Sequence, residues 1–575
     1  MKLSSYVPHW RSYFPIISTL GKYRRRDFSH DLVAGLMVGV IAVPQAIAYA
    51  FLAGLPAQAG LYASLVPPLI YAVLGTSPGL SVGPVAVIAI MVAEAVRAHA
   101  PAYSDAYLGV TILICLQSGI TLWLLRLTQM GGIINLLSHP VISGFINAAA
   151  IMIILSQLTA LTGIASISGS PFAQATHLVA DIAALNPVAL AIGCASLALL
   201  WIVQRYGFYL VLPFLRRVGR NHPITRTGPM LVSILSIVAV VWLGLDQHHA
   251  IATVGEIRAG LPALTLPPLD LALWIELMPA SAMIALVAYV QSFSIGTRLA
   301  QRKRQRLNSN QELIALGAAN IGAAFTGGMP IAGSLSRSTD RGRTPLTGVV
   351  CVAFIVITLL WFTPFFSALP HAALAAIIIV SVSDFIDFKP IYRYWKFYRH
   401  DSVTHIVALL GVLLFGVERG LLIGILVAVA LFVRQSSRPH IAIVGRVGDT
   451  AAFRNQRRYE VTTVPHVLAV RIDENLYFAN TSLVEERLLR LAARNPQIRH
   501  VLLVCSAINF IDTSGLGMLE RINEALARKD VLLHLSDVKG PVMDQLKTTE
   551  LPTELSGDIF FTTDEAMRDL GSRIV

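Results

Sequence analysis

The chain has 575 residues, of which 55% are hydrophobic and only 14% are charged. A soluble globular protein carries about 25% charged residues, so this composition excludes a wholly soluble chain. The net charge of +12 would suit a nucleic-acid-binding protein, but the Lys and Arg residues cluster in loops between long apolar blocks. That distribution is typical of membrane proteins, so we expect the lipid bilayer, and no nucleic acid, as a partner.

Apolar blocks long enough to cross a bilayer recur over residues 31–435, since one span needs roughly 20 largely apolar residues. The preceding segment, 1–30, is basic and lacks the apolar core of a cleavable signal, so we expect it to be cytoplasmic. After a linker at 436–463, residues 464–575 have the mixed, charged composition of a soluble domain. Isolated cysteines without metal-ligand or disulfide spacing predict no metal site and no cofactor: Cys115, Cys194, Cys351 and Cys505.

The hydropathy pattern predicts fourteen membrane segments before residue 436. Basic residues gather in the loops 204–227, 298–310 and 388–401, whereas 159–185 contains no Lys or Arg. Because cytoplasmic loops carry the excess of Lys and Arg, this asymmetry places the N-terminus inside, and an even number of spans returns the C-terminus to that side. We therefore expect a multi-pass protein of the cell membrane, in a bacterial inner membrane, with both termini cytoplasmic.

The first segment, 31–53, carries two polar side chains one helical turn apart. Gln45 and Tyr49 follow Pro44, which kinks a helix and frees a backbone carbonyl. A glutamine at mid-membrane depth should face the protein interior. There it would bind a substrate or form an interhelical hydrogen bond of purely structural value.

Two segments interrupted by Gly and Pro occupy matching places in the chain. The first, 75–84, follows the first span, and the second, 326–334, follows the eighth span at a similar distance. This order predicts an inverted repeat of seven plus seven segments, with a short broken helix third in each half. Paired broken helices at corresponding positions indicate the binding site of a transporter.

The first broken segment has the residues expected at the start of a half-helix. Ser81 is a candidate cap, and Pro84 suits the first helical turn because its missing N–H would be unpaired there anyway. Gly83 and Val85 flank that proline. A helix that begins here would point free N–H groups and its positive dipole end into a cavity.

The second broken segment repeats the pattern and adds a cation. Ser334 and Ser336 stand at the expected helix start, and Arg337 follows them. Neither 75–93 nor 326–339 contains an Asp or Glu, so the paired helix starts favour an anion over a cation. The alternative is that these Gly and Pro residues only allow close helix packing.

Several short motifs follow one another in a fixed order, and together they resemble the SulP family of anion transporters. They are DLVAGL from Asp31, the pair Pro44 and Gln45, GLYAS from Gly60, GTS from Gly75, SVGP from Ser81, NQEL from Asn310 and SLSRS from Ser334. The resemblance covers nearly the whole chain. It implies the fourteen-span, seven-plus-seven fold of uracil transporters and an anion held between the third and tenth helices, beside the first. The substrate positions that it implies are Gln45, Tyr49, Val85, Ser334, Ser336 and Arg337.

The chain departs from the family at a position that is associated with coupling to H+ or Na+. Many coupled members have an acidic residue in the eighth span, where this chain has Gln291. A glutamine cannot take up and release a proton, which argues against that route of coupling. The remaining acids in the spans include Glu94 and Glu312. Glu312 is a candidate coupling residue, although it also suits a first-turn charge on a helix dipole.

A second departure follows Ser338. The family usually has a longer stretch before the next Gly-x-Arg-Thr, and here 339–344 comes early by about four residues, which is about one helical turn. We expect the tenth helix to be one turn shorter at its cytoplasmic end, with the site face kept and the inner gate altered.

From residue 464 strands and helices alternate, which predicts an α/β layer. Strands are expected at 467–472 and 500–505, and a capping box at Ser482 and Glu485 opens the helix between them.

The run INFIDTSGL, which begins at Ile508, resembles the signature loop of the STAS domain. In the anti-sigma-factor antagonists of that class a hydroxyl beside the aspartate is phosphorylated. Here the aspartate is Asp512 and the hydroxyl belongs to Thr513 or Ser514, which could equally be a simple helix cap. With no catalytic triad or phosphate loop, we expect an interaction module that binds a cytoplasmic protein, not an enzyme.

These features predict secondary active transport of a small anion by alternating access, as a symporter and a homodimer. Sulfate is the first expectation, and bicarbonate or a dicarboxylate is the alternative. An uncoupled exchanger, channel or sensor on the same fold is the second hypothesis, and a cytoplasmic docking platform is the third.

Overall fold

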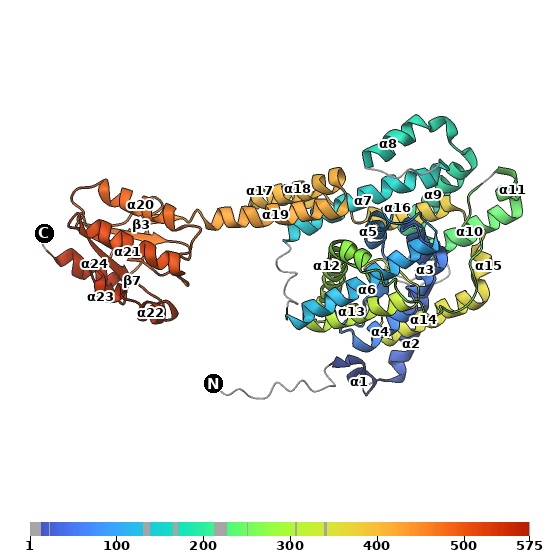
Figure 1. The fold of residues 1–575 in the computed structure, drawn as a ribbon, viewed down its shortest axis with the longest axis horizontal. Coiled ribbons are helices and arrows are strands. Elements are labelled where there is room, and N and C mark those ends of the chain that lie inside the picture. The colour runs from blue at the N-terminus through green and yellow to red at the C-terminus, as the bar shows by residue number, and fades with distance from the viewer. Residues whose placement is uncertain are drawn as a thin grey trace. The chain divides into compact units, whose positions relative to one another are not determined.

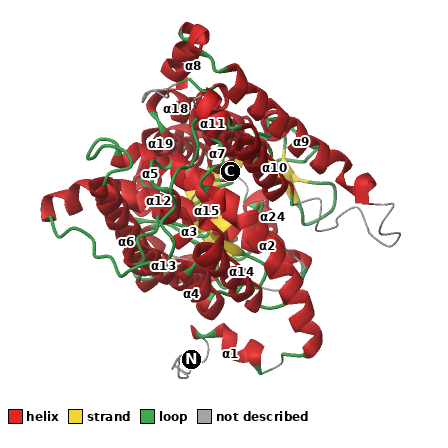
Figure 2. Cartoon of the chain, turned by 90° about the vertical axis from the view of Figure 1, so that its right-hand side faces the viewer, coloured by secondary structure: helices red, strands yellow, loops and turns green. Residues whose placement is uncertain are grey.

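The computed structural model describes residues 13–21, 23–129, 138–164, 171–211, 227–249, 251–304, 307–338 and 342–573. The chain divides into two compact units, Met1–Leu426 and Val427–Val575. The first unit is a bundle of helices, and the second combines a sheet with helices (Figure 1). Helices make up most of the chain, with few strands between them (Figure 2).

The first half of the helical unit contains seven of the expected segments. Their elements are α2 (Arg25–Leu52), α3 (Ala57–Tyr62) with α4 (Val66–Leu74), β1 (Ser81–Gly83) with α5 (Ala86–Val96), α6 (Asp105–Leu127), α7 (His139–Thr162), α9 (Pro187–Val211) and α10 (Gly228–Leu243). Shorter elements lie before, between and after them: α1 (Pro15–Leu20), α8 (Pro171–Ala180), η3 (Ile182–Ala184) and α11 (Leu245–His249).

The second half repeats this order. Its elements are α12 (Leu271–Arg302), α13 (Ser309–Phe325), β2 (Ala332–Ser334), α14 (Leu346–Ile357) continued by η5 (Thr358–Phe362) and α15 (Thr363–Phe366), α16 (His371–Ser383), α17 (Lys389–Phe397), α18 (Arg399–Phe415) and α19 (Val417–Ser436). Among the described residues, seven helical stretches are long and apolar enough to cross a membrane, and three shorter helices are also apolar.

The two broken segments meet as a pair of short antiparallel strands. β1 and β2 pair in the register Ser81↔Ser334, Val82↔Gly333 and Gly83↔Ala332. Equivalent segments that pair antiparallel are what an inverted repeat requires. Each strand satisfies backbone groups of the other at a depth where lipid offers none.

Three details at these segments differ from expectation. Ser81 lies in β1 and does not cap α5, whose N-cap is Val85, and Pro84 precedes the helix instead of standing in its first turn. The tenth segment, expected as a half-helix that starts near Ser334 and Ser336, is a single turn in the described residues, closed by a 3.0 Å hydrogen bond from the Ser338 N–H to the Ser334 carbonyl. The expected inner-gate change falls partly on 339–341, outside the described residues.

Small residues let the helices approach closely. An added Cβ at Gly119 of α6 would lie 2.7 Å from the carbonyl oxygen of Gly317 in α13, so a larger side chain there would push the two helices apart. Apolar membrane helices associate through such close packing.

The second unit is built around a six-stranded sheet in the order β4-β3-β5-β6-β7-β8. The pairs from β5 to β8 are parallel, and β3 pairs antiparallel with both β4 and β5. β6 reads HVLLV and is buried along its whole length, as expected of a central parallel strand covered on both faces. The strands are β3 (Ile441–Arg446), β4 (Phe453–Asn455), β5 (Val467–Ile472), β6 (His500–Val504), β7 (Leu532–Ser536) and β8 (Ile559–Phe560).

The helices of this unit are α20 (Thr481–Ala493), α21 (Thr513–Ala527), α22 (Gly540–Leu546), α23 (Leu551–Glu554) and α24 (Thr563–Ser572). Two expectations are wrong in detail. β3 and β4 lie within 436–463, expected as a linker, so the sheet begins earlier in the chain. α20 begins at Thr481 after the N-cap Asn480, so Ser482 is inside the helix and forms no capping box with Glu485.

Candidate functional site

The polar residues of α2 reach the second broken segment. Gln45 is buried, and its amide accepts a hydrogen bond from the Ser336 hydroxyl (3.2 Å) and donates one to the Ser381 hydroxyl of α16 (3.2 Å). Tyr49 is buried one turn further along α2, close enough to Arg337 for the two side chains to interact electrostatically. Gln45 therefore faces the interior, as expected of a polar residue in a span.

The turn after β2 brings three serines together. The hydroxyls of Ser334 and Ser336 are 3.1 Å apart. The Ser338 hydroxyl donates to the Ser334 carbonyl (2.5 Å) and accepts from the backbone N–H of Ser81 (3.0 Å). This turn thus links β1, β2 and α2 and presents hydroxyl groups, which can donate to an anion.

Arg337 is a buried cation that has no acidic partner in the described part of the chain. Its side chain is only 2% exposed, and its Nη2 donates to the Pro84 carbonyl (2.6 Å). Its Nε has no hydrogen-bond partner among the described residues, and none of the described carboxylates forms an ion pair with it. A buried charge is costly unless it is paired. An unpaired guanidinium near the start of α5 therefore points to a negatively charged ligand.

Gly83 makes room for that guanidinium. A Cβ at this position would lie 2.9 Å from Nη2 and 3.0 Å from Nη1 of Arg337. No side chain fits there without displacing the arginine.

Residues of α12 and α13 hold β2 in place. The Gln291 amide donates to the Gly333 carbonyl (3.1 Å), and the Gly333 N–H donates to the Ser292 hydroxyl (2.7 Å). The Asn320 amide oxygen accepts from the Ile331 N–H (2.9 Å). Sequence reasoning missed Asn320, although an uncharged polar residue within an apolar span was a usable signal.

Two cavities lie beside these residues and share Asp384 in their walls. One has a volume of about 220 Å³ and is lined by Gln45, Ser336, Ser381 and Asp384 together with apolar side chains. The other has a volume of about 300 Å³, and its lining includes Gln291 as well as charged and polar side chains: His139, Asn147, Arg298, Asp384 and Asp387. Sequence reasoning missed Asp384, which directly follows the last residue of α16.

The two candidate acids named from the sequence lie apart from these cavities. Glu312 is fully buried and accepts from the Tyr71 hydroxyl (2.9 Å) and from both the N–H (2.9 Å) and the hydroxyl (2.5 Å) of Thr76. Glu94 accepts from the N–H of Val417 (3.0 Å) at the start of α19. Glu312 is thus held by backbone and hydroxyl donors, and Glu94 is held by a backbone N–H.

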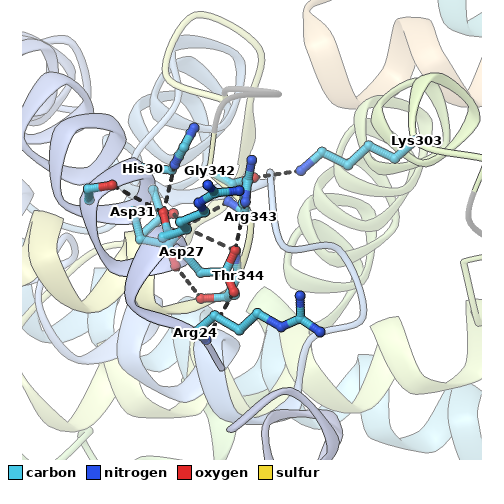
Figure 3. Close-up of polar contacts among 11 residues, drawn as sticks. Arg24, Asp27, His30, Asp31, Lys303, Gly342, Arg343 and Thr344 are labelled. Carbon is cyan, nitrogen blue, oxygen red and sulfur yellow. Dashed lines mark hydrogen bonds and ion pairs between the residues drawn. The ribbon is translucent and has the colours of Figure 1, made fainter. Parts of the chain in front are cut away.

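Two acidic residues of α2 contact the residues that follow the second broken segment (Figure 3). Asp31 is buried and accepts from the N–H groups of Arg343 (2.7 Å) and Thr344 (3.1 Å), from the Thr344 hydroxyl (2.5 Å) and from the Thr347 hydroxyl (3.1 Å). The Arg343 guanidinium also pairs with Asp27 (3.0 Å). We call this set of contacts the Asp31 latch.

In the second unit, Asp512 is the N-cap of α21. Its Oδ1 accepts from the Gly515 N–H (2.7 Å), and its Oδ2 accepts from the Phe478 N–H (2.9 Å). Thr513 and Ser514 follow it on the first turn, and both are exposed. The capping role therefore belongs to the aspartate and not to Thr513 or Ser514.

A helical membrane unit that brings two broken segments together beside a buried, unpaired cation defines a transporter of small anions. The chain belongs to the sulfate permease family, whose model matches residues 28–408, and residues 458–566 match the STAS domain. This confirms the family and the fold class expected from the sequence, including the multi-pass membrane character and the absence of an enzyme function.

The most similar relatives include plant sulfate transporters. The chain is 34% identical over 570 residues to the probable sulfate transporter 4.2 of Arabidopsis thaliana, with 95% of this chain and 82% of the relative covered. It is 30% identical over 588 residues to the high affinity sulfate transporter 1 of Stylosanthes hamata, with 97% and 86% covered.

Solved structures show the same fold at lower identity. The murine Solute Carrier 26 family member A9 anion transporter in the inward-facing state superposes with a TM-score of 0.89 at 22% identity, covering 99% of this chain and 96% of that one. The transmembrane domain of the cyanobacterium bicarbonate transporter BicA superposes with a TM-score of 0.58 at 22% identity, covering 71% and 98%.

Proposed function

We propose that this chain moves sulfate across a membrane by alternating access. The anion is held by the hydroxyl and amide groups of Ser334, Ser336 and Gln45, near the start of α5 at Val85, and Arg337 supplies positive charge. The observation that carries this assignment is the buried guanidinium of Arg337, which has no acidic partner among the described residues. The sulfate transporters among its relatives support the choice of anion.

Three further residues support this site, each in a different way: Ser81, Gly83 and Tyr49. Ser81 fixes the turn through Ser338, Gly83 leaves room for Arg337, and Tyr49 lies beside the guanidinium. Gln291 positions β2 through Gly333, which is a role that needs no proton.

Bicarbonate is the second candidate substrate, because the fold is also that of a bicarbonate transporter's membrane domain. Sulfate carries two charges and four acceptor oxygens, so it can use more of the serine hydroxyls than bicarbonate can. Dicarboxylates and uncoupled exchange or channel activity remain outcomes of the experiment below.

The test is uptake of radiolabelled sulfate into proteoliposomes that contain the full chain, with unlabelled bicarbonate, succinate or chloride as competitors. We expect sulfate to compete best. Ser336→Glu should abolish uptake, because a carboxylate beside Ser334 and Gln45 repels the anion. Ser572→Glu, at an exposed position of α24, is the matched control and should transport normally. Unchanged uptake by Ser336→Glu would contradict the site assignment. If bicarbonate competed best, bicarbonate and not sulfate would be the substrate.

We also propose the orientation and assembly. The basic loops around 298–310 and 388–401 support cytoplasmic termini in a bacterial inner membrane. We further propose a homodimer and a cytoplasmic protein that binds the STAS domain near Thr513 and Ser514, since both side chains are exposed on the signature loop.

A further inference from the structure

Asp384 occupies a distinctive place between the two cavities. It lines the 220 Å³ cavity together with Gln45 and Ser336, and it also lines the 300 Å³ cavity together with Gln291 and Arg298. Among the described residues, no other acid lies in the wall of the smaller cavity. The position follows Ser383, the last residue of α16, whose Ser381 contacts Gln45.

The carboxylate of Asp384 is exposed, and it forms no hydrogen bond or ion pair with any described residue. Three other acids near the spans have hydrogen-bond donors. Glu312 holds Tyr71 and Thr76, and Glu94 holds the start of α19. Asp387, in the wall of the larger cavity alone, accepts from the Lys389 N–H (2.9 Å).

An ionised carboxylate beside an anion site has a direct electrostatic effect. Like charges in one cavity repel each other, so a bound dianion favours the protonated form of Asp384. Conversely, protonation of Asp384 removes a repulsion and favours anion binding. Binding of the proton and binding of the anion then reinforce each other by the same factor.

We propose that Asp384 is the proton-binding residue that couples anion movement to a proton gradient, an inference that rests on the proposed sulfate transport. On the acidic side, one proton binds the Asp384 carboxylate and forms a neutral carboxylic acid, and sulfate binds beside it. On the other side, sulfate leaves and the proton dissociates to water. Each cycle moves one proton with each sulfate, and no bond other than the O–H bond forms or breaks.

The charged and titratable groups that face Asp384 come from three elements. His139 of α7 and Arg298 of α12 share the larger cavity with it, as does Asp387 from the segment before α17. The described lining of the smaller cavity contributes no other titratable group. The pH dependence that we assign to Asp384 must therefore be separated from that of His139.

The experiment measures sulfate uptake by full-length protein in proteoliposomes, with and without an inward proton gradient of one pH unit. A gradient of one unit drives about tenfold accumulation for one proton per anion. We expect wild-type uptake to rise several-fold with the gradient. Asp384→Asn should lose this stimulation while sulfate counterflow, which needs no gradient, stays detectable. Asp384→Glu should keep the stimulation.

Three controls make the result specific. Asp246→Asn, an exposed acid of α11, should behave as wild type, and His139→Gln should keep the stimulation. Glu312→Gln tests the rival acid. Loss of stimulation in Glu312→Gln with retention in Asp384→Asn would overturn the proposal, as would stimulation of the wild type by a sodium gradient alone. If the wild type shows counterflow but no proton stimulation, this inference fails and sulfate transport stands. If no sulfate moves at all, the proposed function fails.

Discussion

At the scale of residues, the proposed anion site depends most on the charge of Arg337. Helix starts and hydroxyl groups are common in membrane proteins, and by themselves they only favour an anion weakly. A guanidinium that is 2% exposed, with one hydrogen bond to the Pro84 carbonyl and no carboxylate partner among the described residues, leaves positive charge uncompensated in the protein interior. The position of that side chain depends on the absence of a side chain at Gly83.

Gly83→Ala should therefore impair transport. The added methyl group would lie 2.9 Å from Nη2 of Arg337, and overpacking of this kind costs about 1–3 kcal/mol. We expect the KM for sulfate to rise several-fold in proteoliposome uptake. Gly109→Ala is the control, because nothing lies within 4 Å of a Cβ at Gly109. Normal uptake by Gly83→Ala would show that Arg337 can move without affecting the site.

At the scale of elements, the short tenth segment depends on contacts at both ends. Gln291, Ser292 and Asn320 hold its beginning through β2 and Ile331. The Asp31 latch holds residues 342–347, and Lys303 at the end of α12 donates to the Gly342 carbonyl (2.6 Å; Figure 3). A segment with only one described turn has little helical stability of its own, so these contacts fix its position.

Asp31→Asn should destabilise the membrane unit. The carboxylate accepts four hydrogen bonds from donors just before and in the first turn of α14, and a hydrogen bond to a charged group contributes about 1.5–3 kcal/mol. We expect a clear fall in the thermal unfolding midpoint in detergent.

Asp27→Asn is the matched comparison for this latch. It removes the exposed pair with the half-exposed Arg343 and weakens the acceptor for the Arg24 N–H, and exposed contacts of this kind contribute little stability. Equal losses of stability in the two variants would contradict the role given to Asp31.

The positions of most elements could be predicted because hydropathy and charge report directly on the bilayer. The pairing of β1 with β2 could not be predicted, because the pairing of Ser81 with Ser334 depends on tertiary contacts between segments far apart in the chain. Ser81 and Pro84 were placed wrongly for the same reason. Their local pattern suits a helix start, but the strand pairing holds them before α5. Asp384 was missed because an acid that ends a helix near a loop usually faces water, and only the cavity shapes reveal its setting.

At the scale of the whole molecule, the second unit contains a buried histidine pair in its sheet. His500 Nδ1 and His534 Nε2, on β6 and β7, are 3.0 Å apart, and His534 Nδ1 accepts from the Asp558 N–H (2.8 Å). Burial lowers the pKa of His534 to about 4, and burial also lowers the pKa of His500. Both rings are thus neutral at pH 7, and a proton on His534 would break one of its two hydrogen bonds.

This pair should make the STAS domain sensitive to acid. The pKa of His534 is about 4 in the folded protein and about 6.5 in an unfolded chain, so between these values the unfolded chain binds more protons. The contribution of the neutral His534 ring to the free energy of unfolding is therefore fully present above about pH 6.5. It falls by about 2–3 kcal/mol as the pH drops towards 4.

Hydrogen–deuterium exchange of the full chain, corrected for intrinsic rates, measures this loss at β6 and β7. Protection there should fall by tenfold or more between pH 7 and pH 5. His534→Leu should flatten this dependence, whereas the exposed His440→Gln should leave it intact. A pH-independent protection pattern in the wild type would refute the assignment to the pair.

The pairing of β1 with β2 has a consequence for how the protein is made. β1 leaves the ribosome about 250 residues before its partner, which is roughly 10–50 s at ordinary rates of synthesis. During that interval the backbone groups of Ser81–Gly83 have no β2 to pair with, and lipid cannot satisfy them. The first half must therefore wait for β2 in a wet or chaperoned environment, and the pairing beside the proposed anion site can form only after β2 has been made.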